Sequence, residues 1–274
     1  MGMPQGSKSL KRQDEDFLAN IAREVHDLVE KGFYDIDKRI SRSPISLRRA
    51  IEVSKSPAII TEVKFSSPSL GKIRARDEVK AIVSQMERGG ATGISVLTQP
   101  IHFKGSLENL RLTRLATHLP ILMKDFIIDE RQIDAGSGLG ADVVLLIERL
   151  FSKGGYGSLD SLINFAHKRK LEVLLEVNSR DEFERAARSD ADILGINNRD
   201  LGSLDLDLAT TGKVLSSGIR SDKPIVSESG IKNREEIAKL SMLGVSSFLI
   251  GTSIMKSRNI EAKVRELTRL RDKR

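Results

Sequence analysis

The chain contains no cysteine and no tryptophan, and it has only two tyrosines in 274 residues. The lack of cysteine excludes a disulfide framework, a thiolate zinc site and a cysteine nucleophile, and it fits a cytoplasmic protein. No stretch approaches the roughly 18 consecutive apolar residues that a membrane-spanning helix requires. The N-terminal segment MGMPQGSKSLKRQ is polar and lacks the apolar region of a secretory signal, so export is not expected.

Basic residues are in excess, with 45 Lys and Arg against 38 Asp and Glu and a formal net charge of +7. Such a balance favours nucleic acid or an anionic metabolite. Acids are interspersed with the bases over most of the chain, however, and only the C-terminal end is rich in basic residues. We therefore interpret the charge as a solvated surface, and we expect no nucleic-acid partner.

From residue 58 onward, short runs rich in β-branched residues alternate with longer amphipathic segments. The short runs are apolar throughout rather than alternating, which is typical of parallel strands that are covered on both faces. Several of the amphipathic segments end at glycine just before the next run, as helices often do. The expected strands span residues 58–64, 93–98, 120–126, 142–147, 171–177, 192–198, 223–229 and 246–251.

Eight strands, each followed by a helix, predict an α/β fold of the (β/α)8 type, the TIM barrel. The alternative is a doubly wound open sheet. That fold favours a glycine-rich phosphate loop after the first strand, and SSPSLG at residues 66–71 matches such a loop poorly.

Residues 1–57 precede the barrel, and we expect them to form a helical extension packed on it. Residues 58–274 then form the barrel, with one domain overall. A second, short helix is expected near residues 46–53. Two positions for the extension stay open: a cap that closes the bottom of the barrel, or a lid near the active site. The apolar residues of the first predicted helix are Phe17, Leu18, Ile21, Val25, Leu28 and Val29.

Charged side chains occur at the ends of several apolar runs, where the active site of a (β/α)8 barrel lies. Buried charges are costly unless they are paired, so each alone is explained by a salt bridge, whereas the set on one rim indicates a site. Glu62 and Lys64 are two residues apart and share a strand face. Lys124 is expected to be desolvated near Lys64, which would lower its pKa. Glu176 is expected to pair with either lysine. The polar residues at these ends are Glu62, Lys64, Lys124, Asp125, Glu176, Asn197, Arg199, Glu228 and Ser229.

The loops after the seventh and eighth strands begin SESGI and IGTSIM. In these barrels the same two loops often bind phosphate through backbone N–H groups and a short helix N-terminus. Ser229, Gly230, Gly251 and Thr252 are therefore expected at a phosphate. The alternative is two ordinary turns, with Thr252 as a helix N-cap.

No histidine is placed for catalysis, because His26, His102, His118 and His167 lie in predicted helices or loops at no shared spacing. The sequence also contains no recognisable spacing of metal ligands and no nucleophile with a matching base.

Several motifs together are similar to those of the indole-3-glycerol phosphate synthase family, from about Pro57 to Met255. They include ITEVKFSSPSLG, PILMKDFIIDERQI, LLEVNSRDE, GINNRDL, VSESGI and FLIGTSIM. This resemblance implies an anionic substrate that carries an anthranilate ring, a ribulose chain and a terminal phosphate. The implied reaction joins the ring to the ketone and releases carbon dioxide and water, without a metal or an organic cofactor. No obligate protein partner is implied.

The resemblance also implies roles for individual residues. Lys124 matches the general acid that protonates the ketone oxygen, and Lys64 matches the lysine that meets the substrate carboxylate and acts in dehydration. Glu62 and Glu176 match glutamates that remove protons and orient hydroxyl and amine groups. Further substrate contacts are implied for Asn197, Arg199, Glu228 and Ser229. The implied apolar walls are Pro68, Phe103, Phe126, Leu145, Ile147 and Leu201, and the implied phosphate contacts are Ser67, Gly230, Gly251 and Thr252.

The chain departs from the family pattern at three positions. Gln99 stands where an acid is frequent, Leu70 where lysine is frequent, and Thr252 where serine is common. Two other functions remain open. Phosphoribosylanthranilate isomerase is expected to use a cysteine, which this chain lacks. A non-catalytic basic barrel that binds RNA or protein would need a clustered basic surface and salt-dependent binding.

Overall fold

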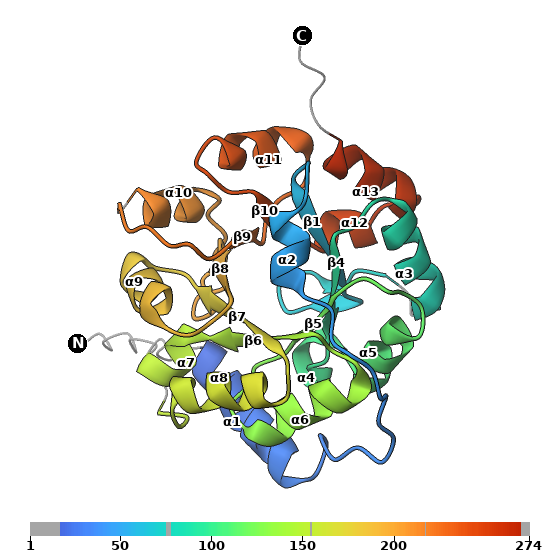
Figure 1. The fold of residues 1–274 in the computed structure, drawn as a ribbon, viewed down its shortest axis with the longest axis vertical. Helices are drawn as coiled ribbons and strands as arrows, with labels where there is room; N and C mark the ends of the chain where they lie inside the picture. The colour runs from blue at the N-terminus through green and yellow to red at the C-terminus, as the bar shows by residue number, and fades with distance from the viewer. Residues whose placement is uncertain (1–16, 75–77, 154, 217, 270–274) are drawn as a thin grey trace, which may run out of the picture.

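The computed structural model describes residues 17–74, 78–153, 155–216 and 218–269. Eight parallel strands form a closed barrel, and the last strand pairs with the first. The predicted (β/α)8 barrel is therefore confirmed, and the open sheet was wrong (Figure 1). The strands are β1 (Ala58–Val63), β4 (Gly93–Leu97), β5 (Ile121–Lys124), β6 (Val143–Ile147), β7 (Glu172–Val177), β8 (Ile193–Asn197), β9 (Ile225–Glu228) and β10 (Ser247–Ile250).

Helices surround the barrel and cover the outer faces of its strands (Figure 1). Every residue of β1 and of β6 is buried, because one face of each strand packs on helices and the other fills the barrel. The outer helices are α3 (Val79–Arg88), α5 (Leu107–Arg114), α6 (Glu130–Leu139), α8 (Leu159–Lys168), α9 (Arg180–Arg188), α10 (Ala209–Leu215), α11 (Arg234–Ser241) and α13 (Ile260–Thr268).

Local sequence signals set several helix ends. α6 begins at a capping box formed by Asp129 and Gln132 and ends at Gly140, whose φ of 94° is left-handed. Ser158, Ser179 and Asn233 cap the starts of other helices through their side chains. The N-caps set where these helices begin, and Gly140 ends α6 where the chain turns back to β6.

Smaller elements lie in the loops after β1, β4, β6 and β10. α4 (Pro100–Phe103), α7 (Glu148–Ser152) and α12 (Thr252–Met255) directly follow three barrel strands. A hairpin of β2 (Ser66–Ser67) and β3 (Gly71–Lys72) follows the first, with Ser67 paired to Gly71. The sequence analysis did not predict this hairpin, because two-residue strands carry no measurable period.

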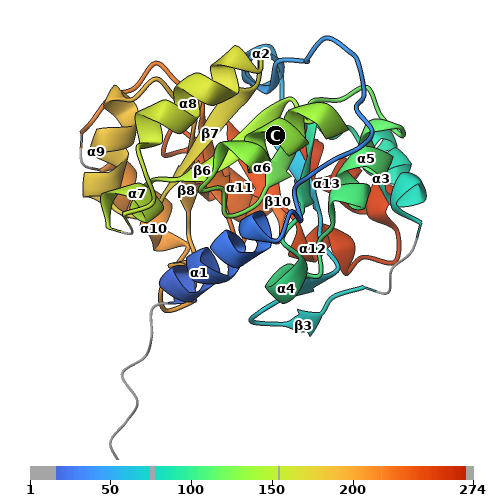
Figure 2. The same cartoon turned by 90° about the horizontal axis from the view of Figure 1, so that it is seen from below.

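The two helices of the N-terminal extension lie at opposite ends of the barrel (Figure 2). α2 (Leu47–Glu52) covers the N-terminal ends of the strands. The carboxylate of Glu172, the first residue of β7, accepts hydrogen bonds from the backbone N of Leu47 at 2.9 Å and of Arg48 at 3.0 Å. α1 (Phe17–Glu30) lies on the side of α4 and β3, at the C-terminal ends. The sequence left two positions open for the extension. α2 occupies the position at the bottom of the barrel, and α1 occupies the position at the C-terminal ends of the strands, where the active site of such a barrel lies.

A buried carboxylate holds the segment between α1 and α2. Asp142, immediately before β6, is almost fully buried. It accepts from the backbone N of Ile45 at 2.6 Å, from Ile121 N at 2.8 Å and from Arg114 Nη1 at 3.0 Å, and it also pairs with Arg42. This pairing offsets the cost of burying the charge. The division into an extension of residues 1–57 and a barrel of residues 58–274 stays a prediction, and residues 1–16 lie outside the described residues.

Within the described ranges, no helix is both long enough and apolar enough to cross a membrane.

Candidate active site

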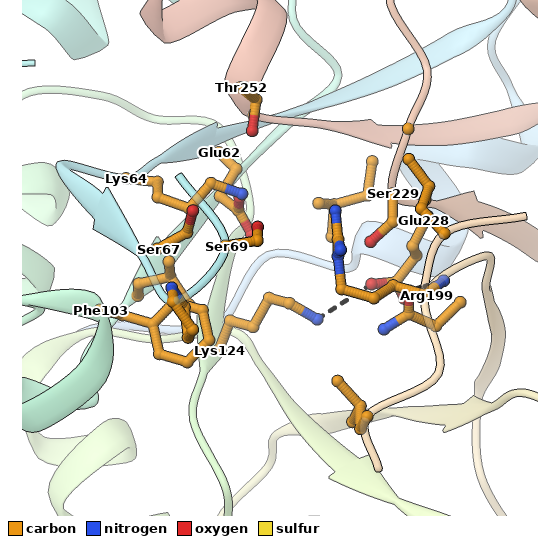
Figure 3. Close-up of a pocket in the computed structure, with 18 of the residues that line it drawn as sticks. Glu62, Lys64, Ser67, Ser69, Phe103, Lys124, Arg199, Glu228, Ser229 and Thr252 are labelled. Carbon is orange, nitrogen blue, oxygen red and sulfur yellow. Dashed lines mark hydrogen bonds and ion pairs between the residues drawn. The ribbon is translucent and has the colours of Figure 1, made fainter. Parts of the chain in front are cut away.

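A cavity of about 620 Å³ opens at the C-terminal ends of the barrel strands. Every residue predicted for the site lines it, so residues from all eight strand ends and their loops meet in one place. They are Glu62, Lys64, Ser67, Pro68, Phe103, Lys124, Phe126, Leu145, Ile147, Glu176, Asn197, Arg199, Leu201, Glu228, Ser229, Gly230, Gly251 and Thr252. In Figure 3, Glu62 and Lys64 face Arg199, Glu228 and Ser229 across the cavity, and Lys124 extends between the two groups.

Lys124 is held between two glutamates. Its Nζ atom lies 2.8 Å from Glu176 Oε2 and 3.0 Å from Glu228 Oε2. Asn197 Nδ2 donates to the other oxygen of Glu176 at 3.0 Å, so that carboxylate is held on both sides. Strand alternation turns all four side chains into the barrel, because each lies at or next to a strand end on the inner face.

The predicted lowering of the Lys124 pKa was wrong. Burial lowers the pKa of Lys124, but the negative charges of Glu176, Glu228 and Glu62 outweigh it and hold that pKa above its usual range. The prediction assumed that the positive charge of Lys64 would be uncompensated and would act on Lys124. Lys64 instead forms an ion pair with Glu62, so its charge is largely compensated.

The buried carboxylate of Glu228 lies in an environment that disfavours its negative charge. Burial is the largest cause that raises its pKa, Lys124 opposes the rise and the negative charges of Glu176 and Glu62 add to it, so that the resulting pKa is about 7. Glu228 Oε1 is buried without a hydrogen-bond partner among the described residues. A Cβ atom at Gly195, on the neighbouring strand β8, would collide with this oxygen. Glycine at position 195 is therefore what leaves room for Glu228 inside the barrel.

The buried side chain of Asp125, next to Lys124, accepts hydrogen bonds from the structure around it. Its carboxylate accepts from Tyr34 Oη at 3.1 Å, from the backbone N of Phe126 at 2.8 Å and from Thr98 Oγ1. Burial raises the pKa of Asp125 to about 6, and these three hydrogen bonds oppose the rise. Because Tyr34 follows α1 in the chain, this contact ties the N-terminal extension to the strand end that carries Lys124.

The two expected phosphate loops lie beside each other on the cavity wall. Ser229 and Gly230 have φ values of 67° and 82°, both left-handed. Gly251 is the N-cap residue of α12 and Thr252 its first helical residue, so the alternative of Thr252 as an N-cap was wrong. Ser67, from the hairpin after β1, contributes a buried hydroxyl that has no hydrogen-bond partner among the described residues. Phosphate and other oxyanions accept hydrogen bonds from such hydroxyl groups and from the backbone N–H groups of glycine-rich loops.

Two aromatic rings form part of the cavity wall. The rings of Phe103 and Phe126 are 6.0 Å apart between centroids. Phe103 belongs to α4, whose N-cap is the fully buried Gln99. Gln99 Oε1 accepts from the backbone N of His102 at 2.8 Å and of Phe103 at 3.4 Å. Gln99, which stands where an acidic residue is frequent in the family, thus caps α4 with a neutral side-chain oxygen.

The chain matches the sequence model of indole-3-glycerol phosphate synthase over residues 15–267. It belongs to the indole-3-glycerol phosphate synthase family. It is 42% identical over 250 residues to indole-3-glycerol phosphate synthase of Methanocaldococcus jannaschii, covering 90% of this chain and 91% of the relative. It is 40% identical over 272 residues to the protein of that name from Aquifex aeolicus, covering 97% and 99%. The resemblance stated from the motifs is therefore confirmed, and the isomerase alternative is set aside.

A solved structure, thiamine phosphate pyrophosphorylase from Pyrococcus furiosus, superposes with a TM-score of 0.58. It shares 18% sequence identity and covers 81% of this chain and 96% of that one. At this identity the likeness concerns the barrel fold alone.

The structure adds cavity residues that the sequence analysis missed. Lys232 and Lys256 follow the SESGI and TSIM motifs closely, and a search for cations beside the two phosphate loops would have found them. Phe17 of α1 also lines the cavity, but no sequence signal identified it because the position of α1 was open. Leu70, the apolar departure from the family pattern, also lines the cavity, lies at the hairpin turn and is about half exposed. Further lining residues include Ser69, Leu204, Leu206 and Ser253.

Proposed function

We propose that this cavity carries out the indole-3-glycerol phosphate synthase reaction of tryptophan biosynthesis. The substrate is 1-(2-carboxyphenylamino)-1-deoxyribulose 5-phosphate, and the enzyme acts as a carboxy-lyase that closes the indole ring. The observation that carries the proposal is the arrangement around Lys124, a cation held in a largely buried cavity by Glu176 and Glu228 and facing the pair of Lys64 and Glu62.

The cavity offers a distinct place for each part of this substrate. The phosphate would bind the loops of Ser229, Gly230, Gly251 and Thr252, with Ser67 as a hydroxyl donor. The aromatic ring would lie on the apolar wall of Pro68, Phe103, Phe126, Leu145, Ile147 and Leu201. Its carboxylate would meet Lys64, which lies on the same side of the cavity as Phe103 (Figure 3).

Carbon–carbon bond formation needs an acid at the ketone oxygen. Since carbon dioxide is lost, the attacking ring carbon is the one that bears the carboxylate. As this carbon bonds to the ketone carbon, the ketone oxygen takes a proton from Lys124 and becomes a hydroxyl. The raised pKa keeps Lys124 protonated, as the donor must be before the step. The electron pair released with carbon dioxide then restores the aromatic ring.

Dehydration needs an acid and a base beside the new ring. Lys64 would protonate the departing hydroxyl, and a carboxylate of Glu62 or Glu176 would take a proton from the substrate, forming the indole double bond. Asn197, Arg199 and Glu228 would orient the hydroxyls of the chain. These steps call only for proton transfer and charge stabilisation by the residues present, so no metal or organic cofactor is proposed. We further propose a cytoplasmic location, with no nucleic-acid, membrane or obligate protein partner.

Turnover of the synthetic substrate tests the proposal. Incubation of the protein with 1-(2-carboxyphenylamino)-1-deoxyribulose 5-phosphate should produce indole fluorescence, and this signal is clean because the chain contains no tryptophan. The Lys124→Met protein serves as the matched control and should give little signal. No product from the unsubstituted protein, under conditions in which it is folded, would contradict the proposed function.

A further inference from the structure

Asn198 lies immediately behind the cavity wall and is fully buried. Its neighbour Asn197 faces the cavity, and successive strand residues point to opposite faces, so Asn198 faces outward from β8. There it fills the space between β8, β9 and α10. Every polar atom of this side chain has a partner within the protein, which is what a buried amide requires.

The side-chain nitrogen of Asn198 contacts the chain that leaves β9. Its Nδ2 atom lies 2.9 Å from the carbonyl oxygen of Glu228, 3.2 Å from that of Ser229 and 3.1 Å from Ser227 Oγ. The backbone N of Asn198 donates to the same Glu228 oxygen at 2.9 Å. The amide therefore holds two consecutive carbonyl groups at the start of a proposed phosphate loop.

The side-chain oxygen of Asn198 is held from the other side. It accepts from Thr211 N at 3.1 Å and from Thr211 Oγ1 at 2.8 Å. Thr211 Oγ1 also lies 2.8 Å from Ser227 Oγ, which completes a closed network of buried polar groups. The amide orientation is thus set by α10 as well as by β9, because only this orientation presents the oxygen to Thr211 and the nitrogen to the carbonyls.

The segment that Asn198 holds has an unfavourable backbone conformation. Ser229 has a φ of 67°, in the left-handed region that a residue with a Cβ atom seldom adopts. Such a conformation persists only where the surroundings over-determine it. The hydrogen bonds from Asn198 to the carbonyls on either side of the Ser229 α-carbon supply that constraint.

We propose that Asn198 is a positioning residue for the phosphate group of the substrate. In a planar trans peptide, the C=O and the N–H point in opposite directions. Fixing the carbonyls of Glu228 and Ser229 toward Asn198 therefore directs the N–H groups of Ser229 and Gly230 the other way, toward the cavity that both residues line. The inference rests on the proposed function, because it assumes that these loops receive the phosphate.

The first test is the crystal structure of the Asn198→Ala protein. Ser229 is expected to leave the left-handed region once its two neighbouring carbonyls lose their donor. Thr113→Val is the matched control, because Thr113 is also fully buried and donates one hydrogen bond to Asn109 O, on α5, far from the loop. If Ser229 keeps its conformation in the Asn198→Ala protein, the inference is overturned.

The second test is the affinity for inorganic phosphate, measured by calorimetry in a double-mutant cycle with Ser229→Gly. Asn198→Ala should weaken phosphate binding by about tenfold in the Ser229 background. It should weaken binding much less in the Ser229→Gly background, because glycine adopts positive φ without a Cβ clash. A merely structural role would give equal losses in both backgrounds, and equal losses would overturn the inference.

The two proposals fail in different ways. If the unsubstituted protein does not bind phosphate at these loops, the phosphate site of the proposed function is wrong, and the Ser229 conformation still decides the role of Asn198. If phosphate binds there and Asn198→Ala leaves both its affinity and the Ser229 conformation unchanged, only the role of Asn198 is wrong. A Thr113→Val protein with normal phosphate affinity and a similar loss of thermal stability would support the positioning role.

Discussion

Lys124 Nζ and Glu228 Oε2 lie 3.0 Å apart in a site where the Glu228 side chain is almost entirely buried. Each group changes the ionisation of the other. Glu228 helps to hold the pKa of Lys124 above its usual range, and Lys124 limits the rise that burial imposes on the pKa of Glu228. The pair therefore combines a lysine that is protonated at neutral pH with a carboxyl group whose pKa is raised to about 7.

Lys124→Met should abolish most activity. Methionine keeps much of the side-chain length but cannot donate a proton, so kcat should fall on the order of 10²-fold or more, with a smaller change in KM. The variant should also lose thermal stability at neutral pH, because Glu176 and Glu228 keep their burial and lose their cation. Steady-state fluorescence assays and thermal melts measure both effects. Near-normal kcat would make Lys64 the better candidate for the acid.

Glu228→Gln should change how stability depends on pH. The folded state raises the pKa of Glu228 from its ordinary value to about 7. The folded protein thus binds this proton more tightly than the unfolded chain does. The stabilisation of the folded state by this bound proton is complete below the ordinary pKa of a glutamate and is lost as the pH rises through about 7. Melting temperatures of the two proteins should therefore diverge between about pH 5 and about pH 8, with glutamine relatively more favourable at the higher pH. A constant difference would contradict the assigned pKa.

Gly195→Ala should disturb Glu228 from the neighbouring strand. The added methyl group would collide with Glu228 Oε1 and approach Leu174 Cδ2. Overpacking of this kind costs about 1–3 kcal/mol, and displacing the carboxylate should lower kcat as well. Gly212→Ala is the control, because Gly212 lies in α10 and its Cβ would meet only the flexible end of Leu243. Equal kcat in the two variants would show that Gly195 does not position Glu228.

Glu24→Gln should loosen α1 from the mouth of the cavity. Glu24 Oε2 lies 2.6 Å from His102 Nε2, and the ring of Phe17 meets His102 edge-on with centroids 5.3 Å apart. His102 precedes Phe103 in α4, so this contact steadies the aromatic wall. We expect a few-fold higher KM with little change in kcat, since a partly exposed hydrogen bond contributes on the order of 1 kcal/mol. Arg23→Gln is the control, because Arg23 is on the same helix and its side chain donates to Asn20 Oδ1 within α1. Identical KM values in the two variants would refute the role of α1.

Much of the fold was predictable because the strands are buried on both faces. Every one of the eight expected runs became a barrel strand, within a few residues at each end, because short runs that are apolar throughout and separated by amphipathic helices are typical of a covered parallel sheet. The β2–β3 hairpin was not predictable, since its pairing joins only two residues on each side. Its turn reflects local backbone geometry more than any periodic pattern.

The strand-end residues of the cavity were also predictable, whereas their ionisation was not. Strand ends and motifs identified the charged groups at the ends of the strands, because a set of such groups on one rim indicates a site, but they missed Lys232 and Lys256 in the loops. The sign of the Lys124 pKa shift depends on which groups surround its Nζ, and those groups come from β1, β7 and β9. Sequence spacing within a single strand carries no information on such contacts.

By itself, the sequence determined the number and order of the strands, the family and the residue types at the strand ends, because each is written in short local patterns. Only the tertiary structure decided that α1 borders the cavity while α2 closes the opposite end. It also decided that Lys64 is compensated by Glu62, and that Asn198 stands behind Ser229. The physical reason is common to these cases. Burial, charge compensation and backbone constraint are set by neighbours that barrel closure brings together from distant parts of the chain.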